Sequence, residues 1–220
     1  MNKGCVIAMV SLLLGCGQPS EAPSRPQAMP EQNAKPVDTS GERLLAQPPI
    51  NWQQVFRSDR PGGRLVEYVP DDAAAGDWSE KLAFESFTAD QFPLPQDLIG
   101  QIGADQEATC EKLTNTQTFA GDENGYATAV HLLVCFVNKL TNQGQVSLIK
   151  AIRGDGHFYV ITMAARTQPM ELDNELPLPP ELVAQWAAYL GAIRVCNPDA
   201  PAHPCPAGGA GVEPLEALGS

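Results

Sequence analysis

Apolar and polar residues alternate along much of the chain after residue 63. A period of two is typical of strands that bury one face, because successive side chains point to opposite sides of a sheet. The pairs Asn124-Gly125 and Asp155-Gly156 stand between alternating runs and favour tight hairpins, since these residues adopt a positive φ at little cost. The pattern predicts a short helix or a strand near Trp52, and strands at residues 64–69, 82–87, 112–119, 126–137, 146–152 and 158–165.

Two other segments have the spacing of amphipathic helices. After Pro93-Leu94-Pro95, the residues Leu98, Ile99 and Ile102 form an apolar stripe, and proline is tolerated in a first helical turn. The second segment covers residues 181–193 and also has one apolar stripe. The order of elements predicts an α+β fold, with an antiparallel sheet of about five to six strands and two helices packed mainly on one face. The most apolar run, residues 126–137, is expected to be the central strand.

The start of the chain has the three parts of a secretory signal: the basic Lys3, an apolar run from Val6 to Leu14, and the small Gly15. The run is shorter than the roughly 20 residues of a membrane-spanning helix. A cysteine directly after Leu13-Leu14-Gly15 is typical of a lipobox, so we expect cleavage before Cys16 and acyl chains on that cysteine. The alternative is an ordinary secreted protein that is cleaved a few residues further on.

The segment from residue 17 to residue 49 is rich in proline, serine, glutamine and alanine and has no apolar periodicity. Such a composition does not bury enough surface to offset the entropy of ordering. We expect a disordered tether that spans about 30 Å, with one possible helical turn starting at Ser40. The predicted organisation is a signal peptide at 1–15, the lipidated Cys16 with the tether at 16–49, a single domain at 50–205 and a flexible tail at 206–220.

The charge of the chain limits its partners. The formal net charge is −12, and loss of Lys3 with the signal peptide leaves 13 basic and 26 acidic residues, a net charge of −13. An acidic surface of this size repels nucleic acid and anionic lipid head groups. Contact with a membrane is therefore expected through the acyl chains on Cys16, each buried methylene contributing about 0.8 kcal/mol.

Four cysteines remain after the signal peptide and the lipidation site are set aside. In an exported chain they predict two disulfides, for which three connectivities are possible. We favour the pairs Cys110–Cys135 and Cys196–Cys205, and a zinc site is the rival interpretation. Neither pair has close ligand spacing, and no histidine stands beside Cys110 or Cys135.

No motif of a catalytic site or a cofactor site occurs in the sequence, so we expect no catalytic residue, no cofactor and no metal ligand. Of the three histidines, His131 is expected in the core, and His157 and His203 at the surface. Trp78 is interpreted as an anchor at the core edge, with ligand stacking as the alternative. Residues 122–124 lack the spacing of a calcium loop, and residues 153–155 are interpreted as part of a hairpin and not as an adhesion signal.

Several short motifs occur in a fixed order: Glu67-Tyr68-Val69-Pro70 before Trp78-Ser79-Glu80, then Lys150–Gly154 before Phe158-Tyr159-Val160, and last the loop Cys196–Cys205. In this order the chain resembles an uncharacterised group of bacterial secreted and lipoprotein domains over residues 64–205. Its topology is similar to that of PsbP-like α+β domains. The resemblance implies an accessory or binding role and no catalytic residue, since a fold alone does not determine function.

These observations predict a lipid-anchored envelope protein whose domain binds a protein partner and is not an enzyme. Gly17 stands where an aspartate usually retains lipoproteins in the inner membrane, so we expect the outer membrane, facing the periplasm. Two alternatives stay open. One is a hydrolase-like envelope enzyme that uses His131 or His157, and the other is an immunity-type lipoprotein that neutralises a secreted toxin.

Overall fold

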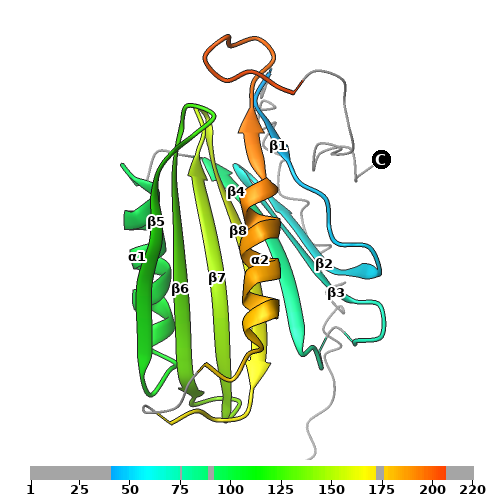
Figure 1. The fold of residues 1–220 in the computed structure, drawn as a ribbon, viewed down its shortest axis with the longest axis vertical. Coiled ribbons are helices and arrows are strands. Elements are labelled where there is room, and N and C mark those ends of the chain that lie inside the picture. The colour runs from blue at the N-terminus through cyan, green and yellow to red at the C-terminus, as the bar shows by residue number, and fades with distance from the viewer. Residues whose placement is uncertain (1–40, 75, 89–91, 172–175, 207–220) are drawn as a thin grey trace, which may run out of the picture. The chain divides into compact units, whose positions relative to one another are not determined.

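The domain is built on a seven-stranded antiparallel sheet (Figure 1). The computed structural model describes residues 41–74, 76–88, 92–171 and 176–206. The α+β prediction is confirmed, and the region near Trp52 forms a strand, so the sheet is larger than the expected five to six strands. Its members are β2 (Trp52–Arg60), β3 (Gly63–Pro70), β4 (Glu80–Thr88), β5 (Leu113–Glu123), β6 (Tyr126–Asn138), β7 (Gln143–Arg153) and β8 (His157–Thr167).

The strand order is β2-β3-β4-β8-β7-β6-β5, which places β8 in the centre. The run 126–137 lies in β6, next to the edge strand β5, so its expected place in the centre is wrong. The reason is the long connection between β4 and β5, which carries the chain to the far edge of the sheet. Three hairpins then return it strand by strand, until β8 pairs with β4. Asn124 (φ 52°) and Gly125 (φ 80°) form the predicted tight turn between β5 and β6.

The two helices, α1 (Pro95–Glu107) and α2 (Pro180–Ala192), cover opposite faces of the sheet. In β7, Leu148 and Ile152 belong to the buried cluster that contains α2, whereas Ile149 and Ala151 belong to the cluster that contains α1. Neighbouring side chains of a strand point to opposite sides. Figure 1 accordingly shows α2 in front of the sheet and α1 behind it. The expected packing of both helices mainly on one face is therefore wrong, because β7 is apolar on both faces and each face is covered.

The larger core lies under α2, where Trp186, Leu190 and Ile193 are buried against the sheet. Each large apolar side chain buried here contributes about 1.5–3 kcal/mol. The smaller core lies under α1, which packs on β5, β6 and β7. The sheet side of the larger core includes Val66, Tyr68, Leu82, Phe84, Leu148, Ile152, Ile161 and Met163.

Described secondary structure is already present before Ile50, the residue at which the domain was expected to start. Residues 43–45 form β1 (Arg43–Leu45), which pairs with β9 (Arg194–Cys196). Leu44 and Ala46 are buried in the core under α2, and this burial offsets the ordering of a segment that has no periodicity of its own. The segment from Gly41 to residue 49 is thus part of the domain, as a strand and not as a helical turn.

Several predictions fall outside the described residues: the signal peptide at 1–15, lipidation of Cys16, most of the tether at 17–40 and most of the tail at 207–220. Within the described ranges, neither helix has the length and apolar character to cross a membrane.

Candidate binding surface

A hollow of about 430 Å³ lies at the end of the sheet where β7 begins and β8 ends. The loop between β3 and β4 supplies Asp72, Asp77 and Trp78 to its lining, and the strand ends supply Gln143 and Arg166. These segments are far apart in sequence and meet because β8 pairs with β4 on one side and with β7 on the other. The hollow is therefore a product of the strand order.

Two cationic side chains contact the indole ring of Trp78. The guanidinium carbon of Arg166 lies 3.9 Å from the centre of its indole ring, and Lys81 Nζ lies 4.9 Å away. Each such cation–π contact contributes about 0.5–2 kcal/mol, depending on its exposure to water. Trp78 is also packed with Val69 and Ala164 in a small buried cluster. The structure thus places Trp78 at the core edge, where its ring holds Arg166 beside the hollow.

Next to the hollow, one side of β3, β4 and β8 is left half-exposed. On the α2 side these strands bury Val66, Leu82 and Ile161. On the other side Val69, Val160 and Ala164 are buried as well, but a patch between them keeps intermediate exposure. The reason is that α1 packs mainly on β5, β6 and β7. We call this surface the open sheet face, and it consists of Leu65, Glu67, Ala83, Glu85 and Thr162.

Ion pairs hold the charged side chains of the open sheet face. Lys81 Nζ lies 2.5 Å from Glu67 Oε1, and Arg60 Nη2 lies 2.8 Å from Glu85 Oε1. Partial burial raises the pKa of the Glu85 carboxyl above its usual value, and the charge of Arg60 opposes that shift. The face therefore presents fixed charges of both signs with the apolar Leu65 and Ala83 between them.

At the opposite end of β8, the carboxylate of Glu42 binds the hairpin between β7 and β8. It accepts hydrogen bonds from the backbone N–H of Asp155 and, at 3.0 Å, from the hydroxyl of Tyr159. A Cβ atom on Gly154 would lie 2.3 Å from Glu42 Oε1, so a side chain at this position would displace the carboxylate from its present contacts. Residues 153–155 therefore belong to a hairpin that the carboxylate of Glu42 stabilises.

The turn between β5 and β6 is tied to the C-terminal loop beside β9. Asn124 Nδ2 donates to the carbonyls of Val195 (2.9 Å) and Pro204 (3.2 Å), and His203 Nδ1 lies 2.9 Å from the Asn124 carbonyl. The His203 ring stacks on Tyr126 at 4.0 Å. Burial, with the nearby charges of Glu42 and Asp155, raises the pKa of the Tyr126 hydroxyl. These contacts fix the turn between β5 and β6 against the C-terminal loop.

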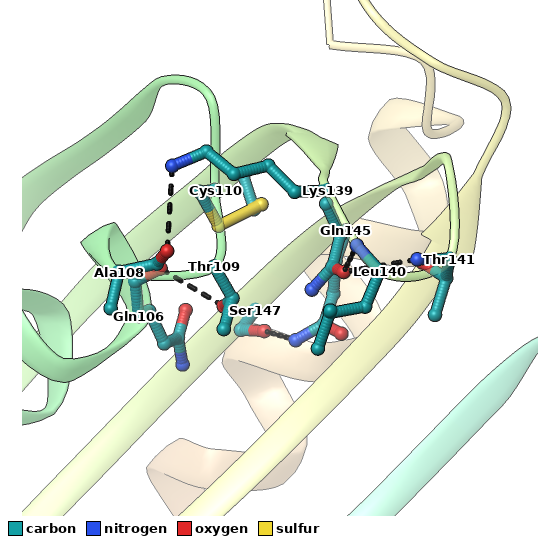
Figure 2. The surroundings of a disulfide bond; sticks show 11 residues. Gln106, Ala108, Thr109, Cys110, Lys139, Leu140, Thr141, Gln145 and Ser147 are labelled. Atoms are coloured by element: carbon teal, nitrogen blue, oxygen red, sulfur yellow. Dashed lines mark hydrogen bonds between the residues drawn. A yellow bond between two sulfur atoms is a disulfide. The ribbon is translucent and has the colours of Figure 1, made fainter.

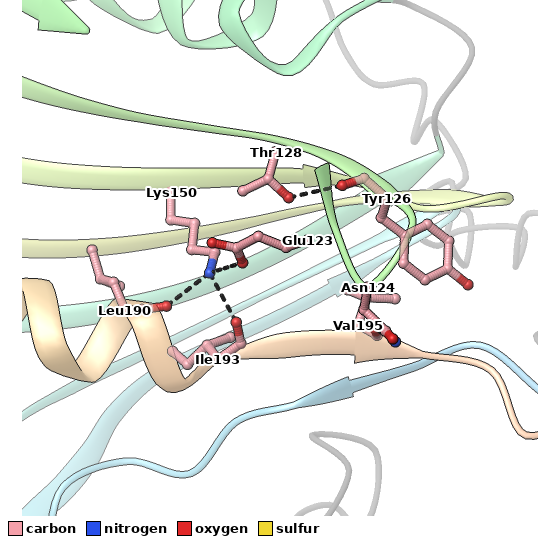
Figure 3. A network of polar contacts seen from close by, with 8 residues as sticks. All are labelled: Glu123, Asn124, Tyr126, Thr128, Lys150, Leu190, Ile193 and Val195. Carbon is pink, nitrogen blue, oxygen red and sulfur yellow. Dashed lines mark hydrogen bonds and ion pairs between the residues drawn. The ribbon is translucent and has the colours of Figure 1, made fainter. Parts of the chain in front are cut away.

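Lys150, like Glu42, is a buried charged residue that sequence reasoning missed. It is fully buried in β7, and its Nζ donates to Glu123 Oε2 (2.5 Å) and to the carbonyls of Leu190 (2.8 Å) and Ile193 (2.9 Å) (Figure 3). Burial lowers the pKa of the ammonium group, and Glu123 opposes the shift. The last turn of α2 has no basic residue of its own, so the sheet supplies the cation that its carbonyls favour. The signal in the sequence was a lysine inside an otherwise apolar run.

The histidines do not form a common site. His131 is buried under α1 with Nδ1 2.6 Å from Asn115 Oδ1, and burial lowers its pKa. His157 begins β8 on the α2 side, 6.2 Å from the ring of Tyr159. Strand alternation therefore places His131 and His157 on opposite faces of the sheet. The core position expected for His131 agrees with its burial.

The four cysteines form the two favoured pairs. Cys110 is bonded to Cys135 (S–S 2.01 Å) and joins the end of α1 to β6, and Cys196 is bonded to Cys205 (2.03 Å) beside β9. Around the first bond, Lys139 Nζ donates to the Ala108 carbonyl at 3.4 Å (Figure 2). The thiolates that the rival zinc site needs are consumed in these bonds, and the described residues contain no group of three or more candidate metal ligands.

Comparisons with known proteins show resemblance in fold alone. No protein-family model matches the chain, and no curated protein sequence matches it. Among solved structures, LpqN, involved in cell envelope biogenesis of Mycobacterium tuberculosis, is 14% identical over 72% of this chain and 86% of its own, with a TM-score of 0.41. The Saccharomyces cerevisiae Ran-binding protein Mog1p is 12% identical over 69% and 85%, with a TM-score of 0.40. A mutant of the protein Mog1 is 13% identical over 67% and 79%, with a TM-score of 0.40.

Proposed function

We propose that this chain is a lipid-anchored envelope protein whose domain binds a protein partner through the open sheet face and catalyses no reaction. The observation that carries the proposal is the half-exposed patch on β3, β4 and β8, with its two ion pairs. Side chains that are already held in place lose little conformational entropy on binding, which favours complex formation. Charges of both signs on such a face favour a partner with complementary charges.

The distance between Glu42 and the hollow supports the same proposal. Glu42 contacts Asp155 at one end of β8, and the hollow lies at the other end. The eleven residues of β8 separate the two by roughly 35 Å. A partner at the hollow end of the open sheet face therefore lies far from Glu42 and β1, the first strand that the structure describes.

Site-specific photocrosslinking in cells tests the binding surface. The full-length protein would carry a photoreactive residue at Ala83 or Thr162 on the open sheet face, or at the exposed Gln185 of α2 as a matched control. We expect one discrete protein adduct from the first two positions and none from the third. Adducts of equal yield at all three positions, or none at Ala83 and Thr162, would contradict the proposal.

Lipid attachment is proposed on the lipobox before Cys16, with the periplasmic side of the outer membrane as the location. Metabolic labelling with an alkyne-bearing palmitate tests it. We expect the wild-type protein and the Cys5→Ser control to incorporate the label and to fractionate with outer membranes, and Cys16→Ser to do neither. A labelled or membrane-bound Cys16→Ser protein would exclude this anchor.

A further inference from the structure

We propose that the hollow beside Trp78 and Arg166 binds a short peptide that has both a free carboxylate and a free ammonium group. This ligand is additional to the protein partner proposed above, and its site needs no contact with the open sheet face. The proposal depends on the placement of Arg166, on the acidic residues that share the lining, and on the size of the hollow.

Arg166 is held in place but has no carboxylate partner among the described residues. Its guanidinium lies on Trp78, its Nη1 donates to the Gly76 carbonyl at 3.2 Å, and its backbone N–H donates to Ser79. No described ion pair within 4.0 Å includes it. In contrast, every cation of β2, β3 and β4 is paired with an acid: Arg57, Arg60, Arg64 and Lys81. A fixed guanidinium with unused N–H donors fits a carboxylate, which it can bind through two parallel hydrogen bonds.

Two acidic residues in the same hollow favour a ligand that also has an ammonium group. Asp72 and Asp77 are exposed in the loop between β3 and β4, and neither is in an ion pair within 4.0 Å of a described cation. With one arginine and two aspartates, the lining has no excess of positive charge. A simple anion such as phosphate would be repelled by the aspartates. A ligand with both charges pairs its carboxylate with Arg166 and its ammonium group with Asp72 or Asp77.

Size and neutral polar groups favour a peptide over a larger partner. The volume of about 430 Å³ is near the lower end of the roughly 300–1,000 Å³ that small-ligand pockets occupy. Gln143 and Gln168 line the hollow and have side-chain amides that both donate and accept hydrogen bonds, as the backbone of a peptide requires. The site therefore fits a ligand of a few residues with free ends.

Isothermal titration calorimetry on the purified full-length protein in detergent tests the proposal, with trialanine as the probe. We expect saturable binding of trialanine and at least tenfold weaker binding of both N-acetyl-trialanine and trialanine amide. Arg166→Gln is expected to weaken trialanine binding at least tenfold. The control Arg57→Gln removes an arginine that does not line the hollow and is expected to leave the affinity unchanged.

Double variants make the assignment of each charge testable even if Arg166→Gln alters the local fold. In Asp72→Asn/Asp77→Asn, trialanine should bind at least fivefold more weakly, while N-acetyl-trialanine should bind as it does to the wild-type protein. Absence of trialanine binding, equal affinity for the blocked peptides, or tighter binding of inorganic phosphate would overturn the proposal. None of these results would affect the crosslinks expected at Ala83 and Thr162, so the two proposals fail independently.

Discussion

Replacing Glu123 by glutamine tests whether the buried ammonium of Lys150 depends on that carboxylate. The substitution keeps the shape of the side chain but leaves Lys150 with neutral acceptors alone: the new side-chain amide oxygen and the carbonyls of Leu190 and Ile193. Removing one partner of a buried ion pair costs about 3–5 kcal/mol. The Glu123 side chain is 22% exposed and Lys150 is not exposed at all, so water reaches one side of the pair. We therefore expect the free energy of unfolding to fall by about 2–4 kcal/mol.

Lys150→Met removes all three hydrogen bonds of the ammonium group, yet we expect it to cost only about 1–3 kcal/mol. The loss of hydrogen bonds from a charged donor, about 1.5–3 kcal/mol each, is offset because no ion has to be desolvated. The double variant Glu123→Gln/Lys150→Met should then be more stable than the sum of the single effects predicts, by at least about 1 kcal/mol. Such a difference measures the coupling between the two charges.

Urea unfolding of the disulfide-intact full-length protein, followed by tryptophan fluorescence, measures these values. The matched control is Glu85→Gln, which breaks the Arg60–Glu85 pair at 2.8 Å with side chains that are 58% and 32% exposed. Exposed pairs contribute little, so this variant should cost less than about 1 kcal/mol. The reasoning is refuted if Glu123→Gln is no more destabilising than Glu85→Gln, or if the effects of the two substitutions in the double variant simply add.

Three further predictions concern the buried His131, the glycines of the hairpin after β7, and the two disulfides. Burial keeps the pKa of His131 below its usual 6.5, so below pH 6.5 the unfolded chain takes up a proton that the folded chain does not, and the free energy of unfolding falls as the pH falls. Unfolding curves between pH 5 and 7.5 should lose this slope in His131→Asn, and equal slopes would contradict the burial. In the hairpin after β7, Gly154→Ala should lower the free energy of unfolding by about 1–3 kcal/mol, because its Cβ would overlap the buried carboxylate of Glu42. Gly156→Ala has open space around its Cβ and should change that free energy by less than about 0.5 kcal/mol. Similar melting temperatures of the two variants would contradict this. Replacing both cysteines of a disulfide by serine should lower the free energy of unfolding, and more so for the longer loop. The expected loss is about 3.5 kcal/mol for Cys110–Cys135, with a separation of 25 residues, and about 2.6 kcal/mol for Cys196–Cys205, with a separation of 9. A larger loss for Cys196–Cys205 would contradict loop entropy as the cause.

The hollow shows why sequence reasoning reached only part of the candidate site. Trp78 was recognised as an edge anchor or a stacking residue, because a tryptophan before a strand has few other roles. Arg166 was given no role, since nothing near it in sequence indicates a tryptophan partner. The two residues meet because β8 pairs with β4, and this pairing is a contact between segments far apart in the chain.

The sequence by itself determined what depends on neighbouring residues: most strands from their period of two, the hairpin turns at Asn124-Gly125 and Asp155-Gly156, and both helices. Tertiary structure alone decided the rest: β8 as the central strand, one helix on each face, β1 as part of the domain, and Lys150 under the end of α2. Alternation shows which side chains of a strand share a face, but when both faces are apolar it does not say which helix covers which. That choice is made by the long-range packing that buries both faces at once.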